Sequence, residues 1–194
     1  MSDPRSPVTS RTVRDSAHCL TAAHFTVFGM VTYSFARLEW LIQISIAGGQ
    51  LDFSKTLIVT RSLPYSAKRD TLYALMNNLK KMPEDHKIQI KGFLDAADKF
   101  SVLRNNIAHA MWNEGTRPNS VKPMLILIKG GSGRQMGIED DERDYTIQEL
   151  AQAADKLSWI SNSYLNFLRA AGYTSSIEQK ILDMMASSTS PEGA

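Results

Sequence analysis

Apolar residues recur at alternating steps of three and four along a long segment near the start of the chain, from about residue 17 to residue 47. This row consists of Phe25, Phe28, Thr32, Phe35, Glu39, Ile42 and Ile46. The spacing draws one face of a helix, and a second apolar row beside it predicts a helix that is buried on much of its circumference. Gly48 and Gly49 end the pattern. Glu39 lies within the buried row, and a buried carboxylate needs a partner.

Two more helical segments are predicted in the middle of the chain. The first covers about residues 54 to 81, and Pro64 splits or kinks it because proline cannot donate to the preceding turn. The next begins at Pro83, which is followed by Glu84 and Asp85, a sequence typical of a first helical turn. We expect this helix to continue to about Trp112. Its predicted inward face holds Ile90, Phe93, Ala97, Phe100, Arg104, Ile107 and Met111.

The pattern changes after residue 118. Residues 124–128 form a β-prone run, residues 130–133 are glycine-rich and suit a turn, and residues 135–139 suit a return strand. The last main helix is expected to begin at Thr146, because Glu149 three residues later completes a capping box and Tyr145 can contact Leu150. Its apolar row ends before Gly172.

The sequence therefore predicts an all-α fold, a four-helix up-and-down bundle with a small β-hairpin inserted before the last main helix. Residues 17–172 are expected to form this domain. Residues 1–16, with several Ser, Thr and Pro, are expected to be a flexible arm. Residues 173–194 are expected to hold a short amphipathic helix, at about 176–186, and a disordered tail.

The composition is that of an ordinary globular protein, with 43% hydrophobic and 22% charged residues among 194. A formal net charge of +2 does not indicate a polybasic surface for nucleic acid. Cys19 is the only cysteine and the four histidines lack metal-ligand spacing, so no disulfide, metal or other cofactor is expected. The polar N-terminus and the lack of a long uncharged apolar run predict a cytoplasmic protein without a membrane span.

Residues with catalytic potential gather at the end of the third predicted helix, where Arg104 is followed by Asn105 and then by His109. Arg104 and His109 are separated, on an ideal helix, by about 140° around the axis and roughly 7.5 Å along it, so they do not stack. Asn105 and His109 share a face. A guanidinium can fork onto two phosphate oxygens, and an imidazole can move a proton near neutral pH. In the structural alternative, Arg104 pairs with Glu39 or a carbonyl and His109 helps to cap the helix.

The segment LRNNIAHAMW, residues 103–112, resembles the motif of the HEPN superfamily, in which four to six residues separate an arginine from a histidine and a polar residue commonly follows the arginine. The resemblance extends to the long first helix with its internal Glu39, to the basic second segment with Lys68 and Arg69, and to the insertion before the last helix. It spans about residues 20–172, although only residues 103–112 are specific.

The resemblance implies a metal-independent endoribonuclease that acts as a homodimer. His109 would activate the ribose 2′-hydroxyl or protonate the leaving oxygen, Arg104 would hold the scissile phosphate, and Asn105 would orient His109 or the phosphate. The products would be a 2′,3′-cyclic phosphate and a 5′-hydroxyl. Family settings include toxin–antitoxin and antiviral systems, so an antitoxin or regulatory protein joins RNA as an expected partner. Other family members are inactive, and the alternative is a non-catalytic nucleotide-binding or protein-interaction module.

Three neighbouring residues are candidates for contacts with the substrate. Trp112 can stack on a base or pack the end of the bundle. Asn106 can bond a nucleotide or a turn. Lys68 belongs to a stretch with an excess of positive charge, which either attracts RNA or simply faces solvent. Glu39 is the expected structural partner of Arg104.

Overall fold

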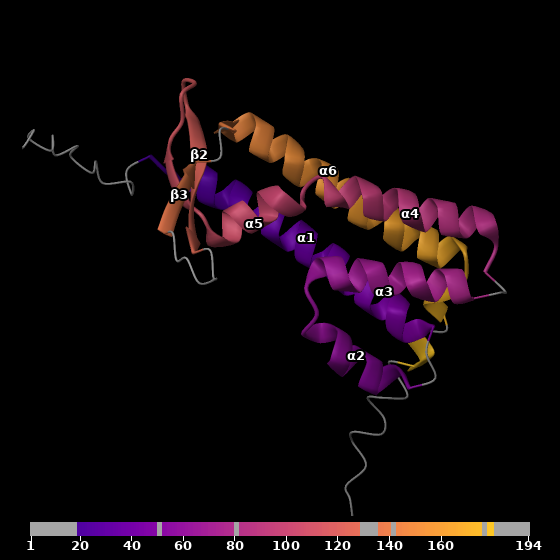
Figure 1. Cartoon of the computed structure of the whole chain (residues 1–194). Helices are drawn as coiled ribbons and strands as arrows, with labels where there is room; N and C mark the ends of the chain where they lie inside the picture. The colour runs from indigo at the N-terminus through magenta and orange to yellow at the C-terminus, as the bar shows by residue number, and fades with distance from the viewer. Residues whose placement is uncertain are drawn as a thin grey trace, which may run out of the picture.

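The computed structural model describes residues 19–49, 52–79, 82–128, 136–140, 143–175 and 178–180. It is mostly helical and carries a small antiparallel sheet (Figure 1). The helices are α1 Ala22–Gly48, α2 Phe53–Arg61, α3 Tyr65–Asn78, α4 Glu84–Asp98, α5 Ser101–His109 and α6 Ile147–Ala170. The strands are β1 Met111–Glu114, β2 Ser120–Ile128, β3 Met136–Asp140 and β4 Tyr145–Thr146.

The long helix α1 is the centre of the fold, as its two apolar rows predicted. Leu38, Leu41 and Ile42 are fully buried, and α6, α3, α2 and α5 all pack against it. At its C-terminal end, Gly49 lets α3 approach closely, because an added Cβ would lie 2.8 Å from Leu75 Cδ2 and the leucine side chain would have to shift. The close approach of α3 therefore depends on the residue that ends α1.

The helix directions differ from those of an up-and-down bundle. Arg37 donates to Asn162 at 2.6 Å, and the hydroxyls of Ser45 and Tyr164 lie 2.8 Å apart, so α1 and α6 run in the same direction. Figure 1 shows α3 running this way too, whereas the chain returns in the opposite direction through α4 and α5. The mostly helical fold is confirmed, and the specific four-helix arrangement is not.

The third predicted helix is interrupted, which contradicts the expectation of a continuous helix to about Trp112. Helix α4 ends at Asp98 and α5 begins at Ser101, whose Oγ donates to the Asp98 carbonyl at 2.8 Å. Phe100, between them, packs against all three clusters of buried apolar residues. The interruption turns the Phe100 ring into the core. The helix is interrupted by this tertiary packing and not by a helix-breaking residue.

The hairpin predicted between the helices is present as β2 and β3, which pair antiparallel with Ile126 opposite Ile138. Two short strands extend it: β1 pairs with β2 through Met111 and Met124, and β4 pairs with the start of β2. Strand β1 takes up residues that the sequence pattern assigned to a helix. The sheet therefore begins directly after α5 and covers its C-terminal end.

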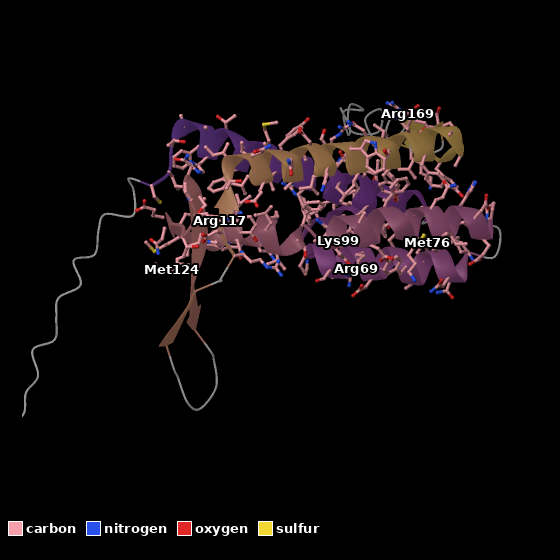
Figure 2. The ribbon with its side chains drawn as sticks, turned by 90° about the horizontal axis from the view of Figure 1, so that it is seen from above. Arg69, Met76, Lys99, Arg117, Met124 and Arg169 are labelled. Atoms are coloured by element: carbon pink, nitrogen blue, oxygen red, sulfur yellow. The ribbon has the colours of Figure 1, made fainter. Side chains whose placement is uncertain are left out.

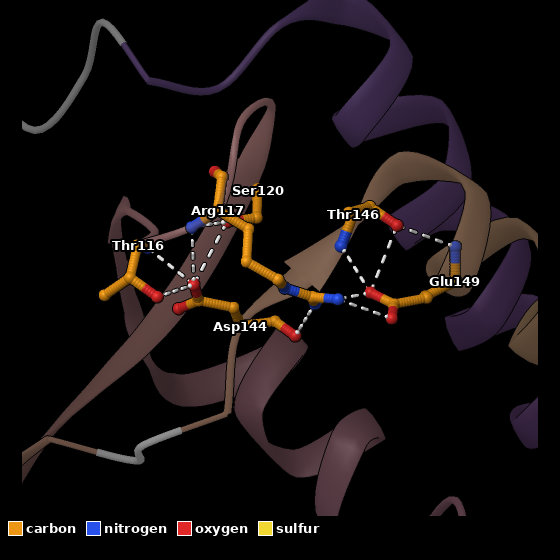
Figure 3. A network of polar contacts seen from close by, with 6 residues as sticks. All are labelled: Thr116, Arg117, Ser120, Asp144, Thr146 and Glu149. Atoms are coloured by element: carbon orange, nitrogen blue, oxygen red, sulfur yellow. Dashed lines mark hydrogen bonds and ion pairs between the residues drawn. The ribbon is translucent and has the colours of Figure 1, made fainter.

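The start of α6 matches its prediction closely. Thr146 Oγ1 accepts from the Glu149 backbone, and Glu149 Oε2 accepts from the Thr146 backbone at 2.8 Å, which completes the capping box (Figure 3). Arg117 adds a bidentate contact to Glu149, with N···O distances of 2.9 and 2.7 Å. Hydrogen bonds from Arg117 and from Thr146 lower the pKa of Glu149 to about 2. This ion pair ties the loop before β2 to α6.

Asp144 holds the same loop from the other side (Figure 3). Its Oδ2 accepts from the backbone of Thr116, from the backbone of Arg117 at 3.0 Å and from Ser120 Oγ at 3.2 Å. These hydrogen bonds, led by the one from the Thr116 hydroxyl, lower the pKa of Asp144. The network fixes the sheet on the bundle and stands apart from the motif on α5.

The predicted arm 1–16 and most of the predicted helix 176–186 and tail lie outside the described residues, of which 178–180 are helical. Among the helices that the structure describes, none is both long and apolar enough to cross a membrane.

Candidate functional site

Helix α5 carries the motif to the surface of the fold. Its inner face is anchored by Leu103 and Asn106, which are 7% and 2% exposed. Arg104 is partly exposed, and Asn105 and His109 are exposed. The shared face of Asn105 and His109, expected from their spacing, is therefore turned to solvent.

Arg104 is held by residues of α1 and by its own neighbour. Its Nη2 lies 3.7 Å from Glu39 Oε1, and its Nη1 donates to Asn105 Oδ1 at 3.1 Å. The guanidinium carbon lies 5.7 Å from the centre of the Phe35 ring, within the range of a cation–π contact. The ion pair with Glu39 that the structural alternative predicted is present.

Lys68 brings a second cation to the same carboxylate. Its side chain is only 6% exposed, and its Nζ lies 3.4 Å from Glu39 Oε2. Lysine is rarely this buried unless it is paired. Glu39 therefore faces a buried ammonium with one oxygen and the Arg104 guanidinium with the other, and this cluster of three keeps one net positive charge.

A polar pocket of about 500 Å³ opens over this cluster and is lined by residues of α1, α3 and α5, with Arg61 from the end of α2 and Asp98 from the end of α4. Its charged lining residues are the cations Arg61, Lys68, Arg69 and Arg104 and the anions Glu39 and Asp98. Arg69, labelled on α3 in Figure 2, pairs with Asp98 of α4. The excess of cations makes this pocket suited to an anion such as a phosphate.

Sequence reasoning missed part of this lining. Arg61, Tyr65 and Asp98 complete the pocket, and Arg69 forms an ion pair with Asp98 across it. Pro64 was the feature of the sequence that could have predicted part of this lining, because a helix that starts there places residues 65, 68 and 69 together on its first two turns. Burial, with a smaller effect of Asp98, raises the pKa of Tyr65, so its hydroxyl stays protonated and donates to the Leu94 carbonyl.

His109 does not line this pocket. It lies in the last turn of α5, where an imidazole is well placed beside the partial negative charge of a helix C-terminus. Asn105 reaches both the pocket rim and the face of His109. A single chain thus brings Arg104, Asn105 and Lys68 together and leaves His109 beside them.

Trp112 and Asn106 lie inside the fold. Trp112 is 6% exposed, and its ring packs against Phe28 at a centroid distance of 4.7 Å and against Tyr145 at 6.0 Å. The structure therefore has Trp112 packing the end of the bundle, and its faces do not present a stacking surface to a base. Asn106 is buried beneath α5, away from the exposed face of the motif.

Within the described ranges, no three His, Cys, Asp or Glu residues are grouped as metal ligands would be. Comparison with protein-family models, curated proteins and solved structures finds no match to this chain.

Proposed function

We propose that this chain is a member of the HEPN superfamily and acts as a metal-independent endoribonuclease. One observation supports this most: Arg104 lines a pocket where four cations face two carboxylates, and an exposed His109 lies on the same short helix. An excess of positive charge attracts the phosphodiester, and the neighbouring imidazole supplies proton transfer.

In the proposed reaction the ribose 2′-oxygen attacks the adjacent phosphorus, and the bond from phosphorus to the 5′-oxygen breaks. His109 removes the proton of the 2′-hydroxyl, and His109 of a second copy donates a proton to the departing 5′-oxygen. Arg104 stabilises the charge on the phosphoryl oxygens, and Asn105 orients the arginine through its 3.1 Å hydrogen bond. The products are a 2′,3′-cyclic phosphate and a 5′-hydroxyl.

A homodimer belongs to this proposal, because a symmetric pair supplies one histidine as base and another as acid. A cytoplasmic location and an antitoxin or regulatory protein partner, as in the family's toxin and antiviral settings, belong to it as well.

The test is cleavage of a single-stranded RNA in EDTA by the wild type and by His109→Ala, Arg104→Ala and Arg169→Ala. His109→Ala removes the general acid and base, and it is expected to slow cleavage by roughly 100-fold or more. Arg104→Ala should also lose activity while staying folded, because Lys68 still neutralises Glu39. Arg169 is exposed near the end of α6, far from the motif, and its replacement is the control (Figure 2). Cleavage that survives His109→Ala would exclude the proposed mechanism.

A second function is favoured by the contacts of Arg104. Its guanidinium already pairs with Glu39, and His109 lies outside the pocket, as a non-catalytic nucleotide-binding or protein-interaction module would require. This alternative predicts no RNA cleavage by any variant. It also predicts that a nucleoside phosphate binds the wild type and that Arg104→Ala weakens this binding, measured by titration calorimetry.

A further inference from the structure

The first two thirds of α1, from Ala22 to Trp40, leave a row of aromatic side chains uncovered. Phe25, Tyr33 and Trp40 are 60%, 70% and 52% exposed. On a helix these positions fall within about 80° of one another, so they form one ridge about 22 Å long. Helix α2 covers only the later part of α1, where Gln43 donates to the Leu57 carbonyl. We call the ridge and the groove beside it the α1 face.

The groove of the α1 face has a volume of about 740 Å³ and runs between α1 and the end of α5. Ile107, Ala110 and Met111 form its far wall. None of the residues that line it is charged. Single-stranded nucleic acid is bound by aromatic rings combined with cations for the phosphates, so this uncharged groove favours a protein as its occupant.

Two small residues alternate with the aromatic side chains. Gly29 and Ala36 line the groove, and a Cβ added to Gly29 would meet no atom within 4 Å outside its own helix backbone. The α1 face therefore presents large side chains at its two ends and centre and hollows between them. Ridges of one helix pack into such hollows of another.

The pattern of large and small side chains on the α1 face is complementary to the same pattern on a second copy of the chain. When two copies of α1 lie nearly antiparallel around a twofold axis between residues 32 and 33, the paired positions are 25 with 40, 29 with 36, and 32 with 33. An aromatic ring then meets an aromatic ring, a small residue meets a small residue, and no like charges meet. We propose that a second copy of this chain occupies the α1 face.

The exposed aromatic rings supply part of the area that a dimer interface needs. The exposed parts of the three aromatic side chains amount to roughly 350 Å², taking about 200 Å² for each ring. A standard interface needs about 800 Å² from each partner, and the groove walls on α1 and α5 are available for the rest. The chain's own N-terminal residues 1–18 fit the groove poorly, because they carry three arginines and few apolar side chains.

The dimer adds a specific interface to the proposed ribonuclease. Only the functional role of the dimer rests on the proposed function; its existence does not. The partner's α1 would lie against α5, the helix that carries Arg104 and His109, so the face and the motif share an element. Association is measured without RNA, and it is expected to persist in His109→Ala. A dimer without cleavage would leave this inference standing and remove the proposed function.

The first experiment is the mass in solution by light scattering at tens of micromolar protein. The wild type is expected at twice the chain mass of 21.6 kDa, and Tyr33→Glu at the chain mass, because two carboxylates would face each other across the axis. Ile88 on α4 is 66% exposed and far from the α1 face, so Ile88→Glu is the matched control and should remain dimeric. A monomeric wild type, or a Tyr33→Glu dimer, would overturn the proposal.

The second experiment tests the pairing of positions. In a Cys19→Ser background, Gly29→Cys and Ala36→Cys are oxidised separately and as a mixture. The mixture is expected to form a covalent dimer efficiently, because the two positions face each other across the interface, and each variant alone should not. A mixture of Gly29→Cys with Ile88→Cys is the control. Equal crosslinking in the control mixture would contradict the pairing.

Discussion

Replacing Glu39 by alanine is expected to destabilise the fold strongly. The change leaves the Lys68 ammonium, with a side chain that is only 6% exposed, beside the Arg104 guanidinium without a counter-charge. Removing one partner of a buried ion pair costs about 3–5 kcal/mol. Glu39 is 17% exposed and its two contacts, at 3.4 and 3.7 Å, are long, so we expect about 3 kcal/mol, near the lower end. For a chain of this size that corresponds to a Tm lower by about 6–12 °C.

Urea and thermal unfolding followed by circular dichroism measure this loss. Glu84→Ala is the control, because the Glu84 carboxylate is 76% exposed and pairs with Lys87 only at the surface, so its removal should cost less than about 1 kcal/mol. The double variant Glu39→Leu with Lys68→Met removes both charges and should recover much of the stability. If the free energy of unfolding of Glu39→Ala lies within about 1 kcal/mol of the wild-type value, the buried cluster does not stabilise the site.

Three further predictions concern stability. Gly115→Ala should lower the Tm, because the new Cβ would collide with Ser120 Oγ inside a tight turn, and a calorimetric scan measures the loss. Glu149→Gln should cost about 1 kcal/mol at neutral pH, after allowance for the 44% exposure of the carboxylate. Because the pKa of Glu149 falls from 4.5 to about 2 on folding, this difference should be present above pH 4.5 and vanish in urea titrations as the pH approaches 2. Tyr164→Phe should cost about 1 kcal/mol in the same assay, because its hydroxyl bonds Ser45 inside the core.

Local signals in the sequence predicted the elements that depend on local chemistry. The capping box of Thr146 and Glu149 marked the start of α6, and Pro64 marked the boundary between α2 and α3. The alternating apolar steps of α1 predicted its length and much of its burial, but Phe25 and Thr32 of the predicted buried row are exposed. The turn at Phe100 and the strand at Met111 were not predictable in this way, because long-range packing and pairing with β2 produce them.

The site was predictable to a similar extent. The position of Glu39 within an apolar row indicated a partner, and the pairing with Arg104 was one of the alternatives that the sequence left open. No feature of the sequence predicted the burial of Lys68, because the depth of this side chain depends on how α3 packs against α1. The pocket combines residues from five helices, α1 to α5, and only the fold brings Arg61 and Asp98 beside Arg104.

We propose that Arg104 and His109 act on an RNA phosphodiester through the neighbouring 2′-hydroxyl. The most direct measurement is cleavage, in EDTA, of an end-labelled RNA that carries a single 2′-deoxynucleotide. We expect cleavage at every normally cut position except after the deoxynucleotide, with a 2′,3′-cyclic phosphate on the upstream fragment and a 5′-hydroxyl on the downstream one. His109→Ala should slow cleavage by roughly 100-fold or more. Cleavage after the deoxynucleotide, or an upstream fragment whose new end is a 3′-hydroxyl, would contradict this mechanism.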